Sequence, residues 1–298
     1  MSEPLKVGVV GAGVFAGYHA AKVAAHDRAI LTSVYDVDPT RAAELADRLD
    51  TSVAVSLSSL IEGADALVIA TPASVHEDAA ITALRAGRHV LIEKPFATTR
   101  AGCEAILAAQ DGLVVQVGHQ ERLVAEAVGL HRLPKRPREI EIVRHTPRTT
   151  RNLDTSVIMD LMIHDIDLLQ GLYGDPDWIS TEAARRIYSP HYDAVRAEMG
   201  FGEMTAYLSA SRDADAERRW IMRFDSGTVA IDFAAKTLRN DTPHDLDADF
   251  GDQPDVRDNL AAAFDRFIRA VLDGERPLAS GRDGSVAVET ARTIEGKP

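Results

Sequence analysis

An aspartate and a histidine four residues apart form the clearest candidate for proton transfer in this chain. Asp160 and His164 lie in a stretch predicted to be helical, so their side chains share one face, with Asp167 on much the same side. A carboxylate one turn from an imidazole orients the ring and raises its basicity, and such a pair can take the proton of an alcohol. A surface ion pair is the simpler alternative. No second histidine stands nearby at helical spacing, so we expect no metal.

A lysine directly after an apolar run is the second chemical candidate. Glu93-Lys94-Pro95 follows His89-Val90-Leu91-Ile92, which has the pattern of a buried strand. At the carboxyl end of a strand, the Lys94 ammonium could hold a substrate hydroxyl and stabilise the alkoxide that forms as hydride leaves. The alternative is a loop lysine in solvent, where most lysines lie.

A glycine turn between a strand and a helix predicts a seat for a pyrophosphate. Gly11-Ala12-Gly13-Val14-Phe15-Ala16-Gly17 follows the apolar run Val7–Val10 and opens a helical stretch. The first glycine permits the tight turn, the second lets the backbone approach the phosphates, and Ala16 takes the third small position. The free N–H groups of the new helix then face the anion. The residues expected to bind the cofactor here are Gly11, Gly13, Val14, Phe15 and Ala16.

An acid at the end of the second predicted strand favours NAD. The strand Ala29–Tyr35 ends at Asp36, twenty positions after Ala16. A carboxylate there can bind both ribose hydroxyls and would repel the 2′-phosphate of NADP. Asp36 could also start a turn and cap the helix predicted from Thr40, and the two roles are compatible.

Further candidates stand at the remaining strand ends. Thr71, Pro72, His76 and Glu93 are expected to line the cofactor pocket, and His119 and Arg122 to face the substrate near the junction of the predicted domains.

The pattern of apolar runs predicts an α/β protein with two domains. Strands and helices alternate over residues 1–120, which predicts an N-terminal Rossmann domain with a doubly wound parallel sheet. Residues 121–298 are expected to form an α+β substrate and oligomerisation domain with a largely antiparallel open sheet. This domain should hold one long helix, Ser156–Tyr173, and an exposed, acidic loop, Arg239–Asp258. Its predicted strands are Trp178–Ala183, Glu203–Ser211, Arg218–Arg223 and Gly227–Ala234.

Composition excludes several classes of protein. A net charge of -13 argues against a nucleic-acid surface, which needs a basic stripe. The single Cys103 excludes an internal disulfide framework. No apolar run approaches the length of a membrane span, so we expect a cytoplasmic protein without a membrane partner.

Taken together, these segments resemble the Gfo/Idh/MocA family of sugar and polyol dehydrogenases. The resemblance rests on Gly11-Ala12-Gly13, Asp36, Thr71-Pro72 with His76, Glu93-Lys94-Pro95, Gly118-His119, and Asp160 with His164. It implies NAD(P)-linked oxidation of a ring hydroxyl, with His164 as general base, Lys94 as partner of the hydroxyl and Asp160 orienting the base or sharing its proton. It also implies a homodimer or homotetramer.

A narrower resemblance is to the branch of this family that oxidises UDP-N-acetylglucosamine at its 3-hydroxyl, for the lipid A precursor pathway. It rests on Gly118-His119-Gln120-Glu121-Arg122, the segment 160–167 and Leu208-Ser209-Ala210-Ser211-Arg212. Arginines that could meet the diphosphate of such a nucleotide sugar are Arg144, Arg148, Arg151 and Arg212. They could equally be solvated loop charges.

One segment departs from that branch, which usually continues Arg-Phe-Asn-Pro where this chain has Arg122-Leu123-Val124-Ala125. A free sugar or inositol therefore remains an alternative substrate. An enzyme that recycles bound NAD to cleave glycosides is a further alternative. A non-enzymatic NAD sensor is disfavoured, because a sensor needs no proton acceptor.

Overall fold

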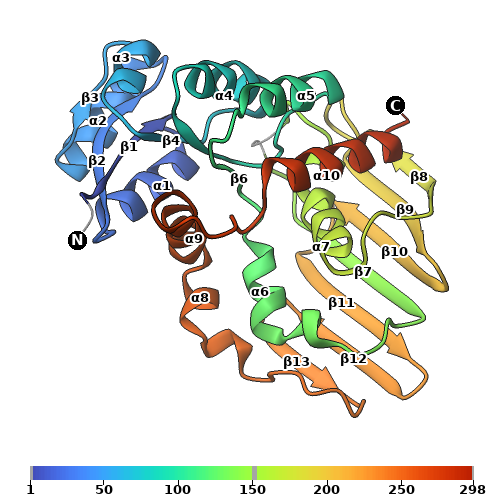
Figure 1. Cartoon of the computed structure of the whole chain (residues 1–298). Helices are drawn as coiled ribbons and strands as arrows, with labels where there is room; N and C mark the ends of the chain where they lie inside the picture. The colour runs from blue at the N-terminus through green and yellow to red at the C-terminus, as the bar shows by residue number, and fades with distance from the viewer. Residues whose placement is uncertain (1–2, 150–152, 297–298) are drawn as a thin grey trace. The chain divides into compact units, whose positions relative to one another are not determined.

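The computed structural model describes residues 3–149 and 153–296, which divide into two compact units (Figure 1). The first unit comprises the described residues up to Gln120 together with Leu260–Ser285. The second comprises Glu121–Asn259 and the described residues from Val286 onward. Within the described residues, no helix has both the length and the apolar character needed to cross a membrane.

The first unit is built on a parallel sheet of six strands in the order β3-β2-β1-β4-β5-β6. Its strands are β1 (Leu5–Val10), β2 (Ala29–Tyr35), β3 (Ser52–Val53), β4 (Ala66–Ile69), β5 (His89–Ile92) and β6 (Val115–Val117). The order reverses between β1 and β4, and a ligand crevice forms at the carboxyl ends of strands at such a point. The predicted doubly wound sheet is confirmed.

Helices cover both faces of this sheet because the inner strands are apolar on both sides. The helices of this unit are α1 (Val14–Ala24), α2 (Pro39–Leu49), α3 (Leu57–Glu62), η1 (Ala73–Val75), α4 (His76–Arg85), α5 (Arg100–Ala109) and α9 (Asn259–Asp273). Val7 and Val9 of β1 face the core under α1 and α9, whereas a Cβ at Gly8 would touch Leu60 of α3 on the other face. This alternation is the period-two pattern of a strand.

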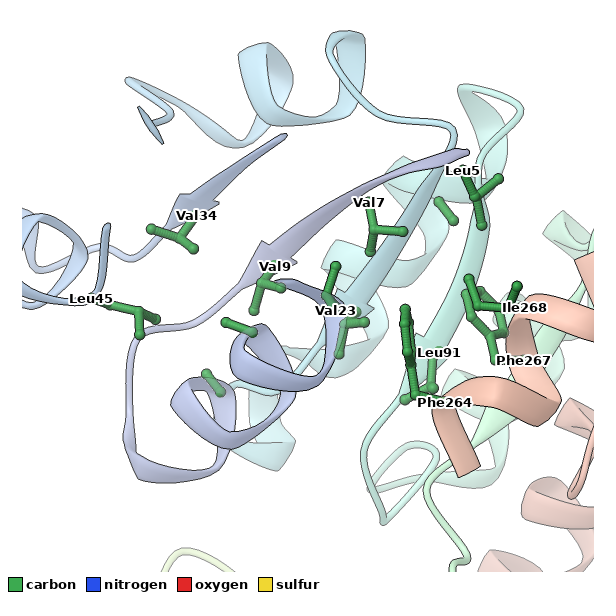
Figure 2. Packing of buried hydrophobic residues seen from close by; sticks show 14 of the residues in the cluster. Leu5, Val7, Val9, Val23, Val34, Leu45, Leu91, Phe264, Phe267 and Ile268 are labelled. Carbon is green, nitrogen blue, oxygen red and sulfur yellow. The ribbon is translucent and has the colours of Figure 1, made fainter. Parts of the chain in front are cut away.

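Helix α9 supplies part of the core of the first unit although it lies far along the chain. Figure 2 shows Phe264, Phe267 and Ile268 packed in the same buried cluster as Val23 and Leu91. The sequence-based division left all of residues 121–298 in one domain. The structure instead assigns Leu260–Ser285 to the first unit, because the apolar face of α9 completes that core.

The second unit is built on a mixed sheet of seven strands in the order β13-β12-β11-β7-β10-β9-β8. Its strands are β7 (Glu139–His145), β8 (Trp178–Arg185), β9 (Ala194–Phe201), β10 (Met204–Ser211), β11 (Glu217–Phe224), β12 (Gly227–Asp232) and β13 (Thr237–Asn240). All neighbours are antiparallel except β7 and β10, so the predicted largely antiparallel sheet is confirmed. The prediction did not include β7, β9 and β13.

The long helix predicted over 156–173 is not one regular α-helix. Residues of η3 (Ile158–Met162) form a π-helical segment, in which the N–H of Ile163 donates to the carbonyl of Ile158, and α7 (Ile163–Tyr173) follows. Such π segments are rare and frequently mark functional sites. The other helices are α6 (Glu121–Val128), η2 (Leu130–Arg132), η4 (Phe250–Asp252), α8 (Pro254–Arg257) and α10 (Gly281–Ile294), of which α10 begins in the first unit.

The acidic segment Arg239–Asp258, predicted to be an exposed loop, is a loop over residues 241–249 and has short regular elements on either side of it. It holds the end of β13, η4 and α8, and it buries Phe250 and Val256. The Asp247 N–H donates to the carbonyl of Val128 at 3.0 Å, which ties the segment to α6. The predicted exposed loop is therefore correct for residues 241–249 and wrong at Phe250 and Val256, whose apolar side chains are buried.

Candidate active site

The glycine turn after β1 has the backbone and the open space that a pyrophosphate needs. Gly11 adopts φ +106°, and a Cβ at this position would lie 2.6 Å from the carbonyl oxygen of Ala70. Gly13 is the N-cap of α1, and a Cβ there would meet no described atom within 4 Å. Ala16 is buried, while the side chains of Val14 and Phe15 are exposed at the helix start. The turn therefore fits the phosphates of a dinucleotide.

Asp36 lies against this turn and has its carboxylate fixed by backbone groups. Its Oδ2 accepts from the Ala12 N–H at 2.7 Å, and its Oδ1 accepts from the Asp38 N–H at 2.8 Å. The helix cap is a different residue, because the side chain of Asp38 accepts from the N–H groups of Thr40 and Arg41. Asp36 thus starts the turn, as one alternative proposed, but it does not cap α2, which begins at Pro39.

Glu93 is a buried carboxylate at the end of β5, held by partners from other elements. Its Oε1 accepts from His19 Nε2 of α1 at 2.7 Å and from Gln120 Nε2 at 3.2 Å, and its Oε2 accepts from the Lys94 N–H at 3.2 Å. Burial alone would raise the pKa of this carboxyl group. The hydrogen bond and charge of His19, with the charge of Lys94, outweigh burial and hold the pKa below its ordinary value.

His76 connects the ends of β4 and β5. Its Nδ1 lies 2.8 Å from the carbonyl oxygen of Pro95, and its Nε2 lies 2.9 Å from that of Thr71. Burial lowers the pKa of the imidazole, although both carbonyls favour the protonated ring. Lys94 lies between these contacts, partly exposed, in a turn whose Lys94–Pro95 peptide is cis. Thr71, His76, Glu93 and Lys94 therefore form one connected cluster, and Pro72 precedes η1 beside it.

Asp160 and His164, the residues predicted to transfer the proton, lie where the π segment passes into α7. Asp160, which is 7% exposed, is in η3, and the partly exposed His164 is in the first turn of α7. The π segment packs on β10 and β7 of the same unit. The carboxylate and the imidazole are therefore presented from one continuous, anchored helical stretch.

Two arginines expected to face the substrate form internal ion pairs instead. Arg144 of β7 makes a bidentate pair with Asp165 at 2.6 and 3.0 Å, and the Trp220 indole donates to the same carboxylate at 2.9 Å. Arg122 of α6 makes a bidentate pair with Asp167 at 2.8 and 2.7 Å. Burial alone would lower the pKa of Arg144, but the charges of Asp165 and of Glu121 in α6 raise it. We therefore assign these arginines to the interior of the second unit.

The remaining substrate candidates are dispersed. Arg212 is fully buried, with Nε 2.9 Å from Asp193 Oδ1, so it holds the loop before β9 rather than a ligand. Arg148 is exposed and pairs with Asp213. Arg151 lies outside the described residues. His119 is buried in the first unit, whereas Arg122 belongs to the second.

Within residues 3–149 and 153–296, no three His, Cys, Asp or Glu side chains are grouped so as to hold a metal ion. Two contacts of the cofactor region were missed by reasoning from sequence. His19 was not among the residues predicted to bind the cofactor, yet its Nε2 lies 2.7 Å from Glu93 Oε1. Arg41, five residues after Asp36, lies 3.1 Å from its Oδ1. The sequence signal for this contact is an arginine in the first turn of the helix that follows a strand ending in an aspartate.

Comparison with known proteins identifies relatives along the whole chain. Residues 5–119 match the family described as "Oxidoreductase family, NAD-binding Rossmann fold", and residues 126–231 match the "GFO/IDH/MocA C-terminal domain". A UDP-N-acetylglucosamine 3-dehydrogenase of Acidithiobacillus ferrooxidans is 32% identical, covering 96% of this chain and 97% of that protein. An inositol 2-dehydrogenase of Rhodococcus erythropolis is 27% identical, covering 92% and 85%.

Solved structures show the same architecture. That of the Acidithiobacillus ferrooxidans enzyme has a TM-score of 0.87 at 30% identity, covering all of this chain and 98% of that one. The WlbA dehydrogenase of Bordetella pertussis, in complex with NADH and UDP-GlcNAcA, has a TM-score of 0.84 at 23% identity and covers 99% and 97%, so that likeness is one of fold.

Proposed function

The chain belongs to the Gfo/Idh/MocA family of NAD-binding oxidoreductases, and from this premise we propose that it oxidises the 3-hydroxyl of UDP-N-acetylglucosamine to a ketone. The protein is an NAD-dependent enzyme that acts on CH–OH groups, and its first unit is the NAD-binding domain. The observation that carries the choice of substrate is the 32% identity to an enzyme of that name over nearly the full length of both chains.

The residues of the first unit are suited to binding the cofactor and the reacting hydroxyl. The glycine turn and the start of α1 would hold the pyrophosphate, and Asp36 would bind the ribose hydroxyls. When bound, NAD supplies the acceptor for the hydride that leaves the sugar carbon. Lys94 lies in a turn held by the contact of its own N–H with Glu93 Oε2 and by that of the Pro95 carbonyl with His76. Its ammonium group would bind the reacting hydroxyl and stabilise the negative charge that develops there.

The residues of the second unit are suited to accepting the proton of the hydroxyl group. His164 would accept the proton of the hydroxyl, and Asp160, four residues earlier, would orient the imidazole or share that proton. The neighbouring carboxylates Asp165 and Asp167 are bonded to arginines, so we assign the orienting role to Asp160.

Inositol is the second candidate substrate, and two observations favour it. Inositol 2-dehydrogenases recur among the relatives, including the one that covers 92% of this chain. In addition, the ion pairs of Arg144 and Arg212 remove two of the four arginines from which a diphosphate site was predicted.

The test is the formation of NADH, followed by its absorbance, with UDP-N-acetylglucosamine, free N-acetylglucosamine, glucose and myo-inositol compared side by side. Parallel reactions contain 2-oxoglutarate and an aminotransferase for 3-keto sugar nucleotides, which would remove an unfavourable keto product. We expect NADH only with the nucleotide sugar. Formation of NADH with inositol or a free sugar would support the proposed oxidation but refute UDP-N-acetylglucosamine as the substrate. No formation of NADH with any of the four compounds would refute both candidate substrates.

A further inference from the structure

The chain enters α7 through a turn that holds one residue more than a turn of α-helix. The Asp160 N–H donates to the carbonyl of Ser156, four residues earlier, at 2.9 Å, as in an α-helix. The Ile163 N–H instead donates to the carbonyl of Ile158, five residues earlier. The extra residue therefore lies within this π turn, which contains Asp160 and directly precedes His164.

The π turn is buried and is held at its amino end. The N–H of Val157 donates to the carbonyl of Tyr192 at 2.8 Å, and the side chains of Ile158, Met159 and Met162 are buried. A rare backbone conformation that the surrounding structure holds in place is frequently found at a functional site. The π turn is therefore a candidate for a role in the reaction as well as in packing.

Only one side of this helical stretch is open. Of residues 158–167, Leu161 and His164 are partly exposed and all the others are buried. These two residues are three apart and so share a face. Asp160 is 7% exposed and is next to Leu161 in the chain, so the winding of the π turn decides how its carboxylate is directed relative to His164.

The π turn changes the angle between Asp160 and His164. In an α-helix, residues four apart differ by about 40° around the axis, because each of the four steps advances about 100°. A residue in a π turn advances less, since its hydrogen bond closes on the fifth residue and not on the fourth. The steps from Asp160 to Met162 lie in the π turn, so part of that offset is removed. The carboxylate and the imidazole therefore lie more nearly in line along the helix axis.

We propose that the π turn of η3 is a positioning element for proton transfer: its extra residue brings Asp160 into line with His164, so that the carboxylate orients the imidazole. This inference rests on the proton transfer proposed above and deepens it, but it does not depend on which sugar is oxidised. The alternative is a turn that serves only the packing of η3 on β7 and β10. The two differ in what happens when the extra residue is removed and both side chains are kept.

The test removes the extra residue without changing the spacing of Asp160 and His164. Deletion of Met159 (ΔMet159) leaves Ile163 four residues after Ile158, so their hydrogen bond becomes that of an α-helix. The matched control is M159A, which loses the same buried side chain but keeps the π turn. Deletion of Ile158 (ΔIle158) shortens the turn in a second way and leaves the adaptable Met159 to fill the core.

Each protein is assayed for kcat and KM with the compound that gives NADH in the comparison above. Binding of NADH is measured by titration, and cooperative unfolding is measured by calorimetry. We expect ΔMet159 to lower kcat about ten- to hundredfold relative to M159A, because a misplaced reacting group costs about that much. The KM and the NADH dissociation constant should stay within about threefold of those of M159A, since binding is not the step that changes.

A second substitution links the loss to Asp160. D160N should lower kcat in the M159A background, where the carboxylate is in line with His164. In the ΔMet159 background D160N should add little, because the carboxylate no longer orients the imidazole and the two changes act on one interaction.

The proposal would be overturned by a ΔMet159 protein that unfolds cooperatively, binds NADH and turns over as fast as M159A, or by equal losses from D160N in both backgrounds. If neither deletion protein unfolds cooperatively while M159A does, the π turn serves the fold alone, and the proposal is likewise wrong. Failure of the proposed proton transfer would look different, because D160N and H164A would then leave the kcat of the otherwise unchanged chain as it is. No NADH with any of the four compounds would remove the proposed reaction and this inference with it.

Discussion

Replacing Glu93 with glutamine tests the buried carboxylate that joins α1, β5 and Lys94. The substitution preserves shape, so it creates no cavity. A glutamine oxygen can still accept from His19 and Gln120, which lie 2.7 and 3.2 Å from Oε1. The new amide nitrogen, however, would point toward the Lys94 N–H, which is 3.2 Å from Oε2, so two donors would face each other.

The loss of folding stability in E93Q follows from these contacts. The substituted side chain loses the hydrogen bond that Glu93 accepts from the Lys94 N–H, and the short bond from His19 loses its negatively charged acceptor. Hydrogen bonds to charged groups contribute about 1.5–3 kcal/mol, so we expect E93Q to be less stable by about 2 kcal/mol at neutral pH. For a cooperative unit of roughly 150 residues, this corresponds to a melting temperature lower by about 4–8 °C.

The effect of E93Q should depend on pH in one direction. The folded pKa of Glu93 lies below its ordinary value, so the ionised form contributes stability that is fully present above the unfolded pKa, about 4.3. This contribution is lost as the pH falls through the lower, folded value. The stability gap between wild type and E93Q should therefore be constant near neutrality and should shrink in acid.

Differential scanning calorimetry at several pH values measures this gap, with D265N as the matched control. Asp265 pairs with His26 in the same unit at 3.3 Å, but its side chain is 43% exposed, so D265N should cost under about 1 kcal/mol. A gap below about 0.5 kcal/mol for E93Q, or one that widens in acid, would refute the reasoning.

Three other substitutions follow from the same structure. K94A should lower kcat by about a hundredfold or more, while the NAD affinity measured by titration stays within about threefold of wild type. The control K6A, on the exposed amino end of β1, should change neither quantity. Equal losses in kcat and in NAD affinity would contradict the role of Lys94. G11A should abolish measurable NAD binding or unfold the first unit, because φ +106° and the 2.6 Å approach to a backbone carbonyl leave no room for a methyl group; normal binding by titration would contradict this. D165N should cost about 3–5 kcal/mol in chemical denaturation, because it leaves the buried Arg144 charge without its bidentate partner, and a loss below about 1 kcal/mol would contradict the internal role of Arg144.

The amino-acid sequence by itself determined the parts of this protein whose chemistry is local. A short apolar run, Gly11, Gly13 and an acid at Asp36 predict a strand, a phosphate turn and a ribose contact, because each depends on backbone geometry within a few residues. The alternation of buried strands and helices predicted the doubly wound sheet for the same reason, and the structure confirms it.

Tertiary structure alone decided which charged groups meet. Arg144 pairs with a carboxylate 21 positions away, Arg122 with one 45 away and His19 with one 74 away. The pattern of apolar residues tells which face of an element is buried, but it does not tell which of several acids an arginine will reach. That choice depends on strand order and helix packing, and these likewise assigned α9 to the core of the first unit. Arg144 and Arg212, two of the predicted diphosphate arginines, form internal ion pairs because a buried guanidinium must have a carboxylate beside it, and only the fold determines where that carboxylate lies.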